Sequence, residues 1–205
     1  MEQQRIPLAG IGALLLASAA LMGSPGPSTM SVTAVGAAFG LRRSLAYTLG
    51  LVLGTCLVLG VVATGVFTVL LSVPRLAPVL TAASAAYIVY LAVRIVRAPP
   101  LQRGDPAASA PSFAGGLLLA TANPKAYVAI AAVFAGSRLP GLSPSAEALA
   151  KTTLLALMVV LIHLGWLMAG ASLSRVLRDP VASKIVNMAF AMVLVATSIF
   201  AVLPR

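Results

Sequence analysis

Apolar residues fall in long runs along this chain, and short polar stretches separate the runs. A run of about 20 apolar residues, rising about 1.5 Å per residue as a helix, crosses the roughly 30 Å of a bilayer's hydrocarbon core. Such runs are typical of membrane-spanning segments and not of a soluble core. The pattern predicts six segments, at about residues 6–39, 45–71, 76–96, 113–135, 150–171 and 185–203.

The composition agrees with this pattern. Hydrophobic residues make up 60% of the chain, charged residues 9%, and the mean hydropathy is +1.04. A soluble domain has about 25% charged residues, so the polar coat of a soluble core is missing here. We therefore predict an all-α integral membrane protein without a soluble domain.

The net charge of +10 comes from basic residues that stand in ones and twos between the apolar runs. This arrangement favours membrane flanks over a nucleic-acid surface, which would need a basic patch. If the first segment crosses fully, eight of the 14 Lys and Arg residues lie on one side and five on the other, with Lys125 inside a segment. If the first segment is re-entrant, the bias becomes nine to four. Either way the side carrying Arg42, Arg43 and residues 97–112 is predicted to be cytoplasmic.

The longest polar connection, residues 97–112, divides the chain into two halves of three segments each. This division suggests a single transmembrane domain over residues 1–205, built from two inverted three-helix repeats at about residues 6–96 and 113–203. Residues 24–27 (Ser-Pro-Gly-Pro) and 123–125 (Asn-Pro-Lys) stand at matching places, partway along the first segment of each half.

Both motifs should break their helix. Proline lacks the amide hydrogen and clashes with the preceding turn, and Pro25 and Pro27 flank Gly26. A new helix can begin at Pro27, and Asn123 can cap another that begins at Pro124. Broken helices at matched places in two halves indicate a transporter's binding site. An ordinary proline kink in each helix is the alternative.

The charged groups expected at membrane depth are positive and not negative. The four acids, Glu2, Asp105, Glu147 and Asp179, are expected in loops or at the terminus. A carboxylate cation site and an acidic proton relay are therefore not expected. One His and one Cys cannot supply a metal site, and no cofactor is predicted.

Helices that begin after the breaks present free amides and positive dipole ends, and Lys125 adds a full charge. Together they can hold a carboxylate, and a variant without this charge is expected to lose transport more than folding. A substrate ammonium group would have to use unwound carbonyls near residues 22–23 and 121–122, or tyrosine rings. Small neutral zwitterions therefore fit best. Snorkelling of Lys125 to an interface is the alternative.

Other residues favour packing roles. His163 and Trp166 share a helix face, and a structural histidine is favoured over a proton-coupling one. Gly50 and Gly54 form a GxxxG pattern, whose ordinary meaning is close helix packing.

The chain also resembles the lysine exporter and homoserine-resistance (LysE/RhtB) family of bacterial amino-acid exporters. The resemblance lies in residues 24–27, 40–44 leading to Gly50 and Gly54, 87–91 and 123–126. It implies six segments in two related halves, efflux driven by the proton-motive force, a bacterial plasma membrane, and it allows a homodimer. Many members carry an acid after the first motif where this chain has Ser28, which speaks against basic substrates.

We therefore predict a secondary exporter of small amino acids or related metabolites, which is not an enzyme. The predicted site comprises Pro25, Gly26, Pro27, Asn123, Pro124 and Lys125. The prolines and Gly26 would open the helices, Asn123 would cap one, and Lys125 would bind an anionic group or gate the path. The alternative is an accessory membrane protein for lipid handling or secretion.

Overall fold

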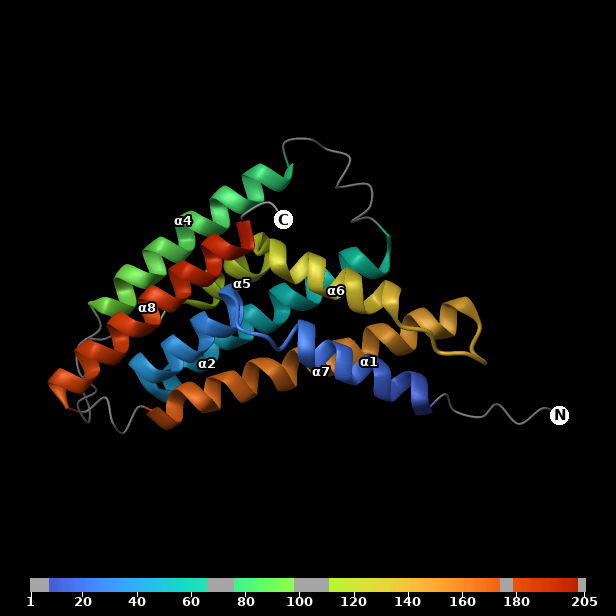
Figure 1. Cartoon of the computed structure of the whole chain (residues 1–205), viewed down its shortest axis with the longest axis horizontal. Coiled ribbons are helices and arrows are strands. Elements are labelled where there is room, and N and C mark those ends of the chain that lie inside the picture. Colours follow the sequence, from blue (N-terminus) through green and yellow to red (C-terminus); the bar gives the residue numbers. More distant parts are fainter. Residues whose placement is uncertain (1–7, 66–75, 98–110, 174–178, 203–205) are drawn as a thin grey trace.

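Helices form almost all of the described part of the computed structural model, which covers residues 8–65, 76–97, 111–173 and 179–202. Figure 1 shows them as one elongated bundle. The helices are α1 (Leu8–Leu21), α2 (Pro27–Ala63), α4 (Leu76–Val96), α5 (Phe113–Ala122), α6 (Pro124–Gly136), α7 (Pro144–Leu173) and α8 (Pro180–Val202). The predicted breaks are present, between α1 and α2 and between α5 and α6.

Helix α2 reverses direction at Gly40, so it has a first arm (residues 27–39) and a second arm (residues 41–63). Gly40 has φ 74° and ψ 168°, a left-handed conformation that favours glycine. The hydroxyl of Tyr47 donates to Oγ of Ser31 at 3.0 Å, whereas a straight helix would separate these residues by about 24 Å. The boundary between the first two predicted segments is therefore present, but one glycine makes the turn, and helix continues through residues 41–44.

Two close helix contacts depend on glycine. A Cβ at Gly50 would collide with the backbone of Phe113 in α5, and a Cβ at Gly170 with the backbone of Thr33. The second arm thus packs on α5, and the first arm packs on α7. Small residues let membrane helices approach in this way, so the packing meaning of Gly50 and Gly54 is confirmed.

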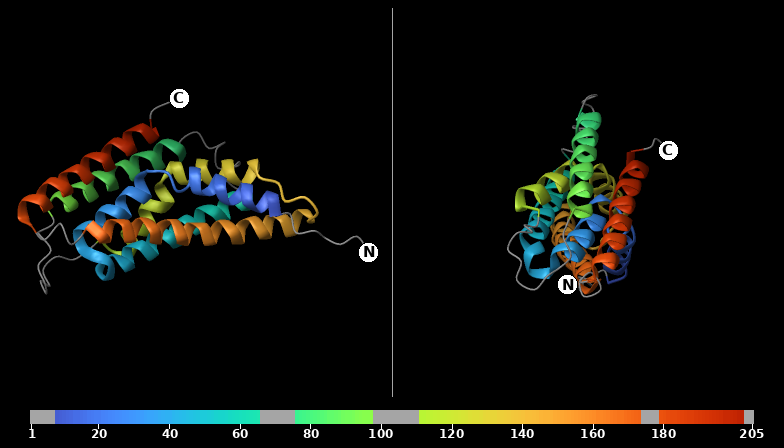
Figure 2. Two further views of the ribbon diagram at one scale, coloured as in Figure 1. Left: turned by 60° about the horizontal axis from the view of Figure 1, so that its bottom comes forward. Right: turned by 90° about the vertical axis from the view of Figure 1, so that its left-hand side faces the viewer.

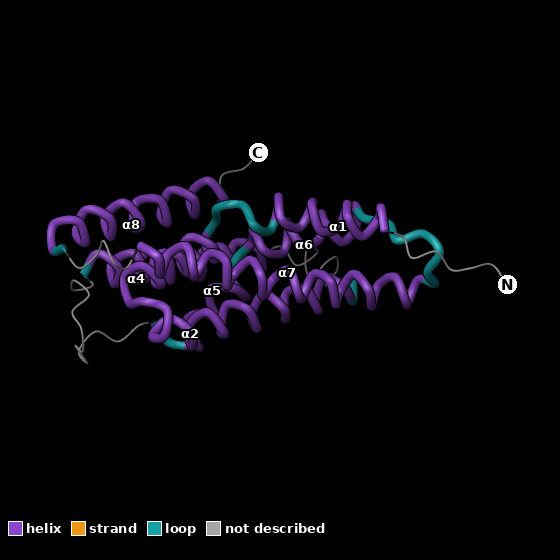
Figure 3. The backbone as a smooth tube through the Cα atoms, turned by 90° about the horizontal axis from the view of Figure 1, so that it is seen from below, coloured by secondary structure: helices purple, strands orange, loops and turns teal. Residues whose placement is uncertain are grey.

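The breaks divide the bundle into two ends along its long axis. α4 and α8 lie side by side at one end, with the first arm of α2 and α5 (Figures 1 and 2). α1 and α6 lie at the other end (Figure 3). Each end has its own apolar cluster, one around Leu91 and Leu167 and one around Leu14 and Leu155.

Prolines in the first turn and polar caps explain where helices begin. Ser143 precedes Pro144, and its Oγ accepts from the amide of Ala146 at 3.3 Å. α7 therefore begins before the predicted residue 150, and Glu147 belongs to its first turn and not to a loop. Glu147 pairs with Lys151 at 2.7 Å, and Lys151 also donates to carbonyls at the end of α6.

By length and composition, α2 and α7 could each cross a membrane, and the pair α5–α6, bent by 61° at its break, is a third candidate. These three candidates belong to the described residues only. The predicted layout of six crossings in two inverted repeats remains a prediction.

Candidate functional site

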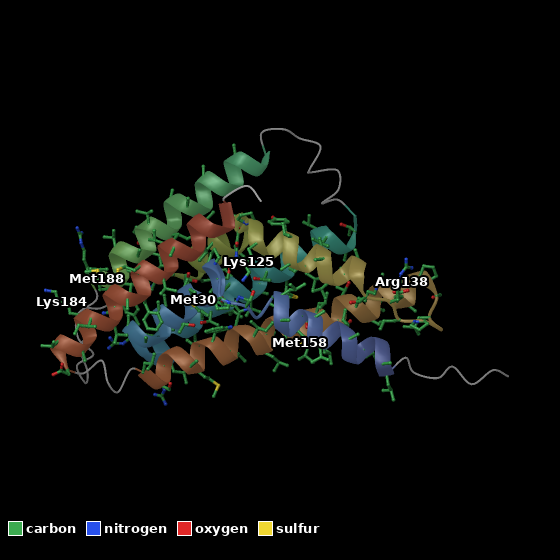
Figure 4. All side chains as sticks on the ribbon, in the orientation of Figure 1. Met30, Lys125, Arg138, Met158, Lys184 and Met188 are labelled. Atoms are coloured by element: carbon green, nitrogen blue, oxygen red, sulfur yellow. The ribbon has the colours of Figure 1, made fainter. Side chains whose placement is uncertain are left out.

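The two breaks lie against each other, because side chains of the second reach the first. Asn123, at the break between α5 and α6, donates from Nδ2 to Oγ of Ser28 at 2.9 Å. Lys125, in the first turn of α6, donates from Nζ to the carbonyl oxygens of Ser24 and Pro25 at 2.7 and 2.8 Å. Residues about 100 apart in the sequence are thus joined at one place. Figure 4 shows Lys125 near the middle of the bundle.

The ammonium group of Lys125 has a full set of partners. Its third bond goes to Oγ of Ser24 at 2.9 Å, and an ammonium has three donors. Lys125 is half-buried and lies far from the ends marked by Arg138 and Lys184 (Figure 4). A snorkelling lysine is expected near an end of the bundle, so this position favours the site interpretation. A substrate carboxylate can reach this charge only by replacing one of its present partners.

Gly26 makes room for Lys125. A Cβ on Gly26 would lie 2.6 Å from Nζ and 2.7 Å from Cδ of the lysine. The backbone of Gly26 is extended, with φ −176° and ψ −178°, a conformation open to any residue. The sequence assigned Gly26 to opening the helix; the structure adds that the missing side chain lets Lys125 cross the break.

The helix starts at the two breaks are capped differently. Oδ1 of Asn123 accepts from the amide of Lys125 at 3.1 Å, as predicted for a cap followed by Pro124. At the other break the hydroxyl of Thr29 accepts from the amide of Gly26 at 2.9 Å, ahead of a helix that begins at Pro27. Both helix starts therefore hold positive backbone ends toward the meeting point.

A cavity of about 40 Å³ opens at the meeting point. This is space for a few water molecules, and an amino acid would need it to widen. Its polar lining comprises Ser28, Thr29, Thr55, Asn123, Lys125 and His163, and its apolar lining comprises Met22, Ala126, Ala129, Ile130, Val159 and Ile162. Of the predicted site, Gly26, Asn123 and Lys125 line the cavity; Pro27 and Pro124 begin the helices, and Pro25 lends its carbonyl.

Two kinds of residue escaped the sequence reasoning. Ser24, Ser28 and Thr29 supply the partners of Lys125, Asn123 and Gly26, and their signal was their position beside the first proline motif. Trp166 donates from Nε1 to the carbonyl of Gly23 at 3.0 Å, and His163 lines the cavity one turn away. Their shared face was visible in the sequence, but what it faces was not.

The fold and the site define a helical membrane protein in which two broken helices meet around a small polar cavity, an arrangement found in transporters. The chain belongs to the LysE type translocator family, whose match covers residues 19–203. The match includes both breaks and every residue of the cavity. Proteins of this family are membrane transporters and not enzymes. Searches of curated proteins and of solved structures found no match.

Proposed function

We propose that the protein is a secondary exporter of small zwitterionic amino acids or related metabolites in a bacterial plasma membrane. The observation that carries the proposal is the meeting of two capped helix starts and Lys125 at one cavity. Backbone amides and a lysine there provide positive charge for a carboxylate. No carboxylate side chain lines this cavity, so a substrate with a net positive charge would lack a counter-ion.

The bonds of Lys125 suggest how binding and movement are coupled. A substrate carboxylate forms a stronger bond to the ammonium than a neutral carbonyl does. It would therefore displace the carbonyl of Ser24 or Pro25, and the first break would lose a tie to α6. We propose that this exchange frees α1 and α6 to move against the buried first arm, which alternating access requires.

The test is export from vesicles that contain the purified protein. Vesicles loaded with labelled alanine, threonine, valine or homoserine should release one or more of them faster than protein-free vesicles. An imposed pH gradient should accelerate the release if the proton-motive force drives it. Absence of release for every small amino acid and related metabolite, with or without a gradient, would leave the accessory-protein alternative in its place.

We also propose six crossings in two inverted repeats, with the Gly40 turn and residues 97–112 in the cytoplasm. Lys184 and Arg138 lie at opposite ends of the bundle (Figure 4), so the two ends can be probed separately. In a Cys56→Ala background, which has no cysteine, a thiol reagent outside intact cells should label Arg138→Cys and not Arg42→Cys. The reverse labelling would invert the orientation. Cross-linking in the membrane would test the homodimer that the family resemblance allows.

A further inference from the structure

His163 lines the cavity and has an unsatisfied ring nitrogen. The residue lies on α7, its side chain is 4% exposed, and it lines the cavity with Asn123 and Lys125. Its Nδ1 lies 2.8 Å from the carbonyl oxygen of Val159. A carbonyl only accepts, so Nδ1 carries a hydrogen, and Nε2 of the neutral ring is an acceptor. This buried Nε2 has no hydrogen-bond partner.

A buried acceptor without a partner costs about 1–3 kcal/mol, so such atoms often mark the place of a ligand. The other polar side chains around it are engaged with the protein. Thr55 donates to the carbonyl of Leu51 at 2.8 Å, and Asn123 and Thr29 serve the two breaks. Nε2 of His163 is thus an acceptor without a partner, and its residue lines a cavity whose charged side chain, Lys125, is a cation.

A zwitterionic substrate needs such an acceptor. Its ammonium group was expected to use the unwound carbonyls of the breaks, but three carbonyls there already accept hydrogen bonds from side chains. The carbonyl of Gly23 accepts from Trp166, and the carbonyl of Thr121 accepts from the hydroxyl of Tyr127 at 2.9 Å. The carbonyl of Ser24 accepts from Lys125. Nε2 of His163, in contrast, is a buried acceptor without a partner, on a residue of α7 that lines the cavity.

We infer that Nε2 of His163 accepts a hydrogen bond from the substrate's ammonium group, and so selects amino acids over carboxylic acids that lack the amino group. The inference rests on the proposed function and deepens it by assigning the second charged group of the substrate. Val159, Ile162 and Ile130 line the same cavity, so a substrate with a small apolar side chain suits it best.

Binding to the purified full chain in detergent tests this inference separately from transport. Trp166 is the single tryptophan, and it is bonded to the first break, so its fluorescence reports on the site. The probes are two pairs that differ by the amino group, L-alanine with propionate and L-valine with 3-methylbutanoate. Titrations at mildly alkaline pH keep the imidazole neutral. The wild-type protein should bind each amino acid at least about tenfold more tightly than its partner acid.

Two variants with amide side chains distinguish the roles of the two ring nitrogens of His163. The side chain of His163→Gln can place an oxygen where Nε2 was, and it should keep the preference. The shorter side chain of His163→Asn can still donate to Val159 but offers the cavity no acceptor, and its preference should fall to near one. A ratio measured within each variant is insensitive to a partial loss of folded protein. Should His163→Asn fail to fold, His163→Phe, which keeps a ring without an acceptor, takes its place.

Several results would overturn the inference. Equal wild-type affinities within each pair, together with normal export of alanine, would refute the role of His163 and leave the proposed function standing. An unchanged preference in His163→Asn would do the same. If no probe binds and vesicles export no amino acid, both proposals fail.

Discussion

The first arm of α2 and helix α6 both begin with a proline at a break, and both are 13 residues long. Every residue of the first arm is buried, from Pro27 to Phe39. In α6 only Ile130 and Val133 are buried, and Val128 is 63% exposed. Two segments that begin in the same way therefore have different environments: the first arm is fully buried in the bundle, and α6 is partly exposed. Of the two, α6 is the better candidate to move.

The two breaks also differ in where their hydrogen-bond partners come from. The first break exposes backbone carbonyls, at Gly23, Ser24 and Pro25, and takes donors for them from α6 and α7 as well as from Thr29. The second break caps itself through Asn123 and sends donors across. The first break is therefore held in place partly by α6 and α7, whereas the second has the cap of its helix within itself. Loss of the ammonium group of Lys125 should therefore disturb the first break.

The largest expected effect concerns the buried arm. Gly170→Ala should destabilise the protein by about 3 kcal/mol or more, because its Cβ meets the backbone of Thr33 and neither helix can yield cheaply. Gly165→Ala is the matched control on the same helix, since a Cβ there meets nothing within 4 Å. Thermal unfolding in detergent measures both. Equal midpoints would mean that the first arm is not packed as closely as the structure shows.

Next in size is Lys125→Met. The sequence suggests a loss of transport with normal folding, but three hydrogen bonds to Ser24 and Pro25 alter that expectation. Export should fall about ten- to a hundredfold, and stability by about 1–3 kcal/mol, because the carbonyls of the first break lose their donor. Lys184→Met, at an exposed lysine, should change neither. Wild-type export by Lys125→Met would remove Lys125 from the site.

Much of the fold could be predicted from the sequence, because proline and asparagine act on the backbone of their immediate neighbours. Both breaks, their places and the cap at Asn123 follow from missing amides and side-chain acceptors, which depend only on neighbouring residues. The apolar pattern does not predict the start of α7, because the residues that mark it, Ser143, Pro144 and Glu147, are not apolar run residues. The apolar pattern separates the first two segments near Gly40, but nothing local distinguishes a turn of one residue from a longer connection.

The site was harder to predict because its contacts are distant in sequence. Lys125 was identified from its place in the first turn of a half-helix. Its partners, Ser24 and Pro25, lie about 100 residues away. His163 received a structural role because its helix face was known but its surroundings were not. Chain pattern predicts which face a residue shares, whereas only the packed structure shows what that face meets.

A smaller effect is expected for the bond between the two breaks. Ser28→Ala and Asn123→Ser each remove the contact between these residues, while serine still caps α6. Each should cost about 1 kcal/mol, and the double variant should cost less than their sum by about 1 kcal/mol. Unfolding midpoints of the four proteins measure this coupling. Strict additivity would mean that the bond does not hold the breaks together.

The smallest effect, and the one that best separates the two breaks, is expected for Gly26→Ala. Its extended backbone accepts alanine, so the change acts through the 2.6 Å and 2.7 Å approaches to Nζ and Cδ of Lys125. The far end of a flexible side chain can move aside, so stability should fall by less than about 1 kcal/mol while the lysine loses some of its three bonds. Gly12→Ala, where a Cβ meets nothing within 4 Å, controls for the change of residue.

In a Lys125→Ala background the space beside Gly26 is empty, and Gly26→Ala should then cost nothing in stability. An equal cost in both backgrounds would show that the first break needs this glycine for itself, and its dependence on Lys125 would be lost.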